Sequence, residues 1–213
     1  MSVKHRLHRA SPAAMLAHVN WKNFLGGLLP RAGRPRPDRE EQLPHVDEEG
    51  RVLGMLPREQ FHQGPGKLHP ALHLHIGDGT GRLYLRKNLP ASPLDPGLWG
   101  TPIVMHAPAH EPMDMALARE LGHGLGVSVP PPGTPNGTPQ PFLRYKWEDE
   151  RESELVFCFI MQYQGVITPN PSTIEEGRFW TRAEINDSLG KGTFAPRFEF
   201  EVRLMERMAP RNP

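Results

Sequence analysis

The segment ALARELGHGLGV, residues 116–127, decides the fold, and its pattern alone indicates the end of an amphipathic helix. Apolar residues recur at three- and four-residue spacings between about Pro112 and His123, which places them on one helix face: Met113, Leu117 and Leu121. Gly124 and Gly126 are expected to stop this helix. The polar residues of the segment have the spacing of an acidic metal site that has lost most of its carboxylates.

Outward from this helix, the chain reads as strands followed by helices. The predicted elements are a hairpin over 45–61 turning at Glu49-Gly50, a hairpin of 71–77 and 82–88 around 78–81, a strand at 101–106, a loop at 129–141, a strand at 154–165, a short strand at 177–180, a helix opened by a capping box at 181–184, and a helix from Pro196. This order predicts an α+β fold with a mixed sheet and helices on its faces.

Composition limits the class of protein. The chain has 213 residues and a formal net charge of +1 with interspersed signs, so polymeric nucleic acid is not an expected partner. The single Cys158 excludes an intramolecular disulfide and a cysteine-rich zinc site, which suits a cytoplasmic protein, and no segment indicates a membrane span. We expect a monomer or a homodimer. Residues 1–43 are expected to form a partly disordered extension and linker, with a short helix from Ser11, before a domain over 44–209.

Several segments around the central helix resemble a Nudix box and its lead-in: PGLW at 96–99, His106 through Glu111, Arg119-Glu120-Leu121 and Leu125-Gly126-Val127. The gap between Glu111 and Arg119 has the length that the box requires. The flanks resemble the branch of this superfamily that contains isopentenyl-diphosphate isomerase, and the resemblance runs from about His45 to about Met208. It implies a Nudix α/β/α sandwich, with a mixed sheet and a small antiparallel sheet between helices.

The resemblance also implies a chemistry that this box only partly supports. Nudix hydrolases cleave organic diphosphates with Mg²⁺ or Mn²⁺ held by glutamates on one helical turn. Here Glu120 is the one metal-binding glutamate of the trio that remains, because His123 and Gly124 occupy the other two positions and Met105 replaces the opening glycine. The usual metal cluster is therefore expected to be weak or absent.

The remaining box residues allow several interpretations, as metal ligands, catalytic residues or structural residues. Glu120, His123 and Glu111 are the candidate metal ligands of the box, and imidazole would favour a softer metal. His123 also reads as an exposed polar residue near a helix end. Arg119 and Glu120 are candidate catalytic residues, or a charge pair that braces the box without catalysis.

A second group of residues matches the metal-site histidines and glutamates of the isomerases: His62, His69, His106, Glu152 and Glu154. Three imidazoles and two carboxylates suit Zn²⁺, Mn²⁺ or a similar ion. The group forms a site only if the fold brings the first hairpin and the ESE strand together, and the chain has 11 histidines in any case. Glu154 is also a candidate catalytic carboxylate.

Isomerase chemistry itself is disfavoured by two positions. The isomerase needs a cysteine two residues before the histidine that matches His106, and here that residue is Val104, which cannot donate a proton. Gly124 stands where a glutamate would hold the magnesium that carries the substrate diphosphate. Cys158 lies in an apolar run and is not expected to substitute.

Further candidates concern substrate binding. Arg86 and Lys87, at the end of a predicted strand, could meet phosphates or could be an exposed sheet-end pair. Tyr145 could stack on a base, although core packing is the favoured reading for it, as for Trp99 and Trp147. Glu175 and Glu176, placed just before a strand, could supply a base from outside the box, but a solvated pair is favoured.

Two hypotheses follow for the function. The first is a Nudix-type hydrolase of nucleoside-diphosphate-linked or other organic diphosphates, with weak or altered activity. The second is a catalytically silent Nudix domain that binds a nucleotide or a protein partner. The expected partner is a small diphosphate or nucleotide, or a protein in the second hypothesis, and not a nucleic acid polymer or a membrane.

Overall fold

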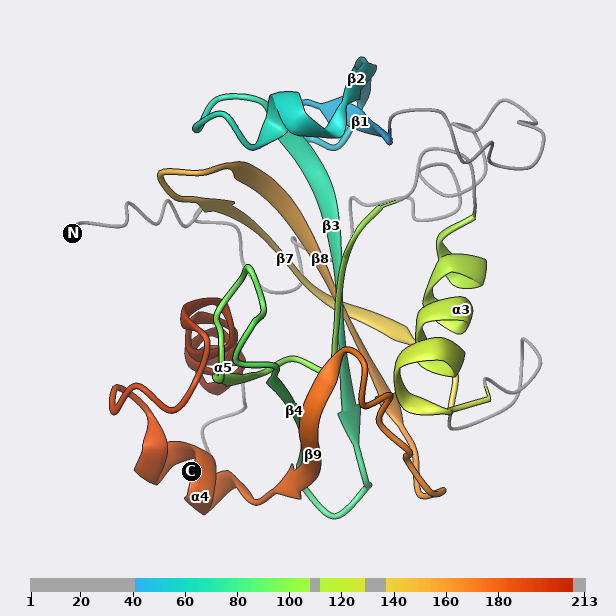
Figure 1. Ribbon diagram of the computed structural model, residues 1–213, viewed down its shortest axis with the longest axis vertical. Helices are drawn as coiled ribbons and strands as arrows, with labels where there is room; N and C mark the ends of the chain where they lie inside the picture. Colours follow the sequence, from blue (N-terminus) through green and yellow to red (C-terminus); the bar gives the residue numbers. More distant parts are fainter. Residues whose placement is uncertain (1–40, 108–111, 129–136, 209–213) are drawn as a thin grey trace. The chain divides into compact units, whose positions relative to one another are not determined.

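The computed structural model describes residues 41–107, 112–128 and 137–208. Its elements, in chain order, are β1 (Gln42–Val46), β2 (Val52–Pro57), the 3-10 helix η1 (Arg58–Phe61), β3 (Leu68–Gly77), β4 (Leu83–Asn88), β5 (Trp99–Gly100), β6 (Ile103–His106), α3 (Met113–Leu125), β7 (Gln140–Glu148), β8 (Ser153–Gln162), β9 (Ile174–Trp180), α4 (Arg182–Ser188) and α5 (Pro196–Met208) (Figure 1).

The strands form two sheets. The antiparallel pair β1–β2 is a small sheet by itself, and seven strands form the large one, in the order β5-β4-β3-β8-β7 with β6 beside β3 and β9 beside β4. A large sheet, a small antiparallel sheet and helices are the combination that the sequence predicted, so the fold class of an α/β/α sandwich is confirmed.

The chain divides into two compact units, each built from separate stretches of sequence. Unit 1 contains the described residues up to His73, Val104–Arg119 and the described residues from Pro141 to Phe159. Unit 2 contains Leu74–Ile103, the described residues between Glu120 and Gln140, and those from Ile160 onward. Strands β3, β6, β7 and β8 and helix α3 each contribute residues to both units.

In unit 1, the β1–β2 hairpin turns at Asp47, whose Oδ1 accepts the backbone N–H groups of Glu49 (3.1 Å) and Arg51 (2.8 Å). This is an Asx turn, in which a short carboxylate satisfies the free donors of the turn. The apolar side chains next to it are buried, among them Leu43, Val46 and Phe61. They anchor the hairpin and the η1 turn that follows it.

In unit 2, an aromatic core holds the strands and helices together. Trp99 and Trp180 meet edge to face with ring centroids 5.1 Å apart, and the Arg178 guanidinium lies 3.7 Å from the Trp180 ring centroid. Helix α5 packs Phe198 and Val202 into the same core. Strand β9 pairs with β4 along its length, as Figure 1 shows. Trp99 is therefore a packing residue, as the sequence indicated.

Most predicted elements are confirmed, and the capping box is complete: the Thr181 side chain accepts from the Glu184 backbone N–H, and Glu184 accepts from the Thr181 N–H at 2.7 Å. The predicted C-terminal helix from Pro196 is also present. No helix in the described part of the chain is long and apolar enough to span a membrane. The helix expected from Ser11 lies outside the described residues.

Four details differ from the sequence-based prediction. Helix α3 continues through Gly124 to Leu125, and Gly126, with φ of 63°, ends it. Strand β7 begins at Gln140, inside the segment predicted as loop, and β3 begins at Leu68, three residues before the predicted start at 71. Glu175 and Glu176 lie within β9 and not before it, because its pairing with β4 extends to Ile174.

Candidate functional site

Unit 1 brings together the three histidines and two glutamates of the predicted second metal site. His62 follows η1, His69 is the second residue of β3, and His106 ends β6. Glu152 immediately precedes β8 and Glu154 is its second residue, so extended backbone two residues apart directs both carboxylates to one side. We call these five residues the His/Glu cluster.

The side chains of the cluster are close to one another and mostly buried. One carboxylate oxygen, Glu152 Oε2, lies 2.9 Å from His62 Nε2 and 3.8 Å from His69 Nε2. The other glutamate, through Oε1, lies 3.8 Å from both His69 Nε2 and His106 Nε2. Side-chain exposure is 18% at His62, 17% at His106 and at most 4% at the other three. Potential ligand atoms of His62, His69, His106 and Glu152 all lie within 4.8 Å of one another.

The hydrogen bond of His62 to the backbone determines which of its nitrogens faces the cluster. His62 Nδ1 is 3.0 Å from the Arg58 carbonyl oxygen, which can only accept, so Nδ1 carries the proton. In the neutral ring, Nε2 then presents a lone pair toward the Glu152 carboxylate. Imidazole nitrogens and carboxylate oxygens gathered this closely are the ligand types that Zn²⁺ and similar ions take. The residues present therefore fit a metal ion.

Arg58 also contacts the other partly exposed histidine. Its Nε lies 3.4 Å from His106 Nδ1 and 3.3 Å from Glu41 Oε2. Since the guanidinium can only donate, this long contact places the neutral His106 proton on Nε2. To bind a metal through Nε2, His106 must give up the contact with Arg58 and carry its proton on Nδ1. Sequence reasoning missed Arg58; the signal available was its position four residues before His62, where a turn directs its carbonyl toward the His62 ring.

The box residues are described in part. Glu120, in the unit 2 portion of α3, is half-buried. Burial of the Arg86 guanidinium lowers its pKa, and the negative charge of Glu120 acts against that lowering. Arg86 Nε has no hydrogen-bond partner among the described residues. His123 is exposed, and Arg119, in unit 1, is exposed as well. Glu111 lies outside the described residues. The structure therefore places Glu120 near a cation and leaves the other box assignments as predictions.

The predicted phosphate-binding and base candidates on β4 and β9 are paired with each other. Lys87 Nζ donates to Glu175 Oε1 at 2.8 Å, and this hydrogen bond raises the pKa of the lysine. A lysine and a glutamate that neutralise one another are less available to a substrate phosphate or to a water. Arg86, the neighbour of Lys87, has no such hydrogen bond from its Nε.

The aromatic candidates of β7 are buried. Tyr145 is 6% and Trp147 4% exposed, and Trp147 Nε1 donates to Asp149 Oδ2 at 2.9 Å. This burial agrees with the core-packing reading. Cys158 is buried in β8, as expected, and Val104 lies in β6, two residues before His106.

Comparisons with known proteins place these observations in context. The chain is 31% identical over 157 residues to the isopentenyl-diphosphate Delta-isomerase of Streptomyces griseus, a match that covers 72% of this chain and 77% of the relative. The isomerase of Streptomyces avermitilis is equally similar, at 31% over 157 residues. No family model matches the chain.

Solved structures share the fold at low sequence identity. The protein DR0079 from Deinococcus radiodurans superposes with a TM-score of 0.61 at 16% identity, covering 80% of this chain and 100% of the other. A MutT protein from Methanosarcina mazei superposes with a TM-score of 0.54 at 15% identity, covering 68% of this chain and 96% of the other.

Proposed function

Because this chain belongs to the Nudix superfamily, among relatives of the isopentenyl-diphosphate isomerases, we propose that it is a metal-dependent hydrolase of an organic diphosphate. In this proposal the His/Glu cluster, and not the depleted box, holds the essential metal. The observation that carries it is the convergence of four potential ligands within 4.8 Å, two of them nearly or fully buried. A nucleoside-diphosphate derivative is the substrate class that we test first.

The donor set favours a transition metal over magnesium. Imidazole nitrogens suit Zn²⁺ and Mn²⁺, whereas Mg²⁺ prefers oxygen ligands and keeps several waters. His62, His69, His106 and Glu152 would hold the ion, which supplies Lewis acidity when bound. Glu154 would accept a proton from the attacking water as general base, since it is buried beside two of these histidines.

Unit 2, considered by itself, offers a residue for an anion. Arg86 keeps a buried Nε without a hydrogen-bond partner in the described chain, and an anionic oxygen would satisfy that donor. Glu120, whose charge opposes the lowering of the Arg86 pKa, would then orient the guanidinium.

Isomerase activity is not part of the proposal. Val104 replaces the acid that the isomerase reaction needs, and Cys158, buried in β8, does not replace it. A specific observation favours the silent domain as the second candidate. Only Glu120 remains of the three glutamates that hold metal in the box. If the His/Glu cluster binds no metal either, the domain would bind a nucleotide or a protein without cleaving a diphosphate.

The test is a phosphate-release screen over nucleoside diphosphates, nucleotide sugars, dinucleoside polyphosphates and isopentenyl diphosphate, with Mg²⁺, Mn²⁺ and Zn²⁺ supplied separately. The variants are His62→Ala and His106→Asn in the cluster and Glu120→Gln in the box, with His45→Ala as a matched control outside both. The two cluster positions are partly exposed, so their variants are expected to fold. Metal content is measured on each variant.

Turnover that is lost with bound metal in both cluster variants, and kept in Glu120→Gln, supports the proposal. Turnover that survives in the cluster variants but is abolished in Glu120→Gln assigns the reaction to the box and overturns it. Absence of turnover in the wild type, followed by its appearance in the double variant His123→Glu, Gly124→Glu, identifies the silent domain.

A further inference from the structure

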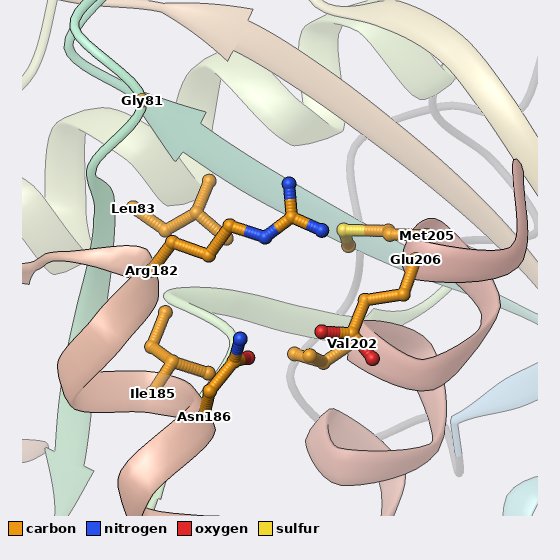
Figure 2. A pocket seen from close by; sticks show the side chains of 8 residues that line it. All are labelled: Gly81, Leu83, Arg182, Ile185, Asn186, Val202, Met205 and Glu206. Atoms are coloured by element: carbon orange, nitrogen blue, oxygen red, sulfur yellow. The ribbon is translucent and has the colours of Figure 1, made fainter. Parts of the chain in front are cut away.

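Unit 2 contains a cavity of about 200 Å³ that the proposed hydrolase reaction does not use. It lies between the start of β4, helix α4 and helix α5, and Figure 2 shows the side chains around it. Gly81 and Leu83 come from the β4 side, Arg182, Ile185 and Asn186 from α4, and Val202, Met205 and Glu206 from α5.

The floor of the cavity is apolar and belongs to the core of the unit. Ile185 and Val202 are core residues, and Leu83 packs against the same core. Met205 closes the α5 side, and its unbranched thioether can adapt to a ligand. An apolar group placed on this floor would extend the core, which is the favourable term for a ligand of this kind.

Two side chains of opposite charge lie at the opening of the cavity. Figure 2 shows Arg182 reaching over the cavity from α4 and the Glu206 carboxylate turned toward it from α5. Both residues are exposed, and neither forms an ion pair within the part of the chain that the structure describes. Asn186 adds an amide, which can donate and accept, on the α4 side.

The volume limits the size of the ligand. About 200 Å³ is room for roughly seven water molecules. It is smaller than the roughly 300–1,000 Å³ of sites for drug-sized molecules. A nucleotide or an organic diphosphate would bring like charges to Glu206 and has no ammonium group to pair with it.

From this arrangement we infer a binding site for a free amino acid with an apolar side chain. The carboxylate of the amino acid pairs with Arg182, its ammonium group with Glu206 and the Asn186 amide oxygen, and its side chain lies on Leu83, Ile185 and Val202. A zwitterion satisfies both charges of the mouth at once. A fatty acid or an alkylamine satisfies only one of them.

The experiment titrates the full chain with L-leucine and L-phenylalanine and follows backbone amide shifts by NMR. The matched probes are 4-methylpentanoate, which lacks the ammonium group of leucine, and isoamylamine, which lacks its carboxylate. We expect saturable shifts at α4 and α5 with millimolar affinity, and binding at least about tenfold weaker for either probe and for the variants Arg182→Gln and Glu206→Gln. Arg203→Gln, on α5 but outside the lining, is the control and should bind leucine as the wild type does.

Met205→Trp provides a second route to the same test, because the larger ring fills the cavity while both charges stay in place. Loss of leucine binding in this folded variant supports the site. Absence of any saturable shift with leucine or phenylalanine overturns the inference, and so does equal affinity for leucine and 4-methylpentanoate, which would identify a carboxylate site instead. None of these outcomes depends on hydrolase activity.

Discussion

Gly122, Gly124 and Gly126 are spaced two residues apart at the end of α3. Alanine should raise the free energy of unfolding at Gly122 and Gly124 and lower it at Gly126. Gly122 and Gly124 are inside α3, where glycine costs roughly 0.5–1 kcal/mol relative to alanine. Among the described residues, a Cβ at Gly122 would meet nothing within 4 Å, and one at Gly124 would meet Ile103 Cδ1 alone, at 3.9 Å. Both substitutions are therefore expected to raise the free energy of unfolding by about 0.5–1 kcal/mol each, and Tm by about 1–4 °C.

Gly126 differs because its φ of 63° is in the left-handed region. An alanine there costs about 1–2 kcal/mol in the backbone, and its Cβ would lie 3.3 Å from Thr168 Cβ and 3.4 Å from the Thr168 carbonyl oxygen. We expect Gly126→Ala to lower Tm by about 2–8 °C. The three variants carry the same chemical change, so each is a control for the others.

The assay is thermal unfolding followed by circular dichroism, with the urea midpoint as an independent measure of the free energy. Shifts of the same sign for Gly124→Ala and Gly126→Ala would refute the assignment of the helix end to Gly126. The result also bears on function, because a stable Gly124→Ala means that the box variant with glutamate at this position can be tested in a folded protein.

Three further predictions can be checked with the same equipment. Zn²⁺ or Mn²⁺ at about one hundred times its Kd should stabilise the wild type by about 2.7 kcal/mol, or about 5–11 °C in Tm, and should leave His62→Ala unchanged; an equal rise in that variant would place the metal elsewhere. Tyr84→Phe should keep or raise stability by up to about 1 kcal/mol, because the buried hydroxyl has no hydrogen-bond partner among the described residues, and burial raises its pKa to about 12. The Thr181 backbone N–H, followed by its hydroxyl and Arg178, lowers the pKa of Glu184 from 4.5 to about 2, so this stabilisation is present above pH 4.5 and is lost as the pH falls toward 2. The Tm difference between wild type and Glu184→Gln should shrink over that range, and a difference that stays constant would contradict the assignment.

Elements encoded by local patterns could be predicted from the sequence. The apolar spacing of Met113, Leu117 and Leu121 predicted α3, and all three are buried. Thr181 and Glu184 form the predicted capping box because its hydrogen bonds join residues three apart. Of the two glycines predicted to stop the helix, Gly126 ends it and Gly124 does not, since a glycine inside a helix costs only about 1 kcal/mol and packing can override it.

The candidate sites depended on other information. His62 and Glu152 are 90 positions apart in the printed sequence, so no spacing rule joins them, and the resemblance to a family suggested the group before the structure brought it together. No resemblance pointed to the cavity between Arg182 and Glu206, because a void depends on how side chains pack in three dimensions. The start of β9 was also hard to predict. Glu175 and Glu176 are exposed within this strand, and two adjacent exposed glutamates are also typical of a loop.

The division of the chain into two units has a practical consequence for dissecting the protein. Each unit takes its residues from three stretches that alternate along the chain, so the polypeptide passes from one unit to the other five times. No single cut can release either unit as a continuous fragment, and deletions from either end would remove parts of one unit while leaving its other stretches behind. The metal and amino acid sites proposed for the two units can therefore be separated by point substitution but not by truncation.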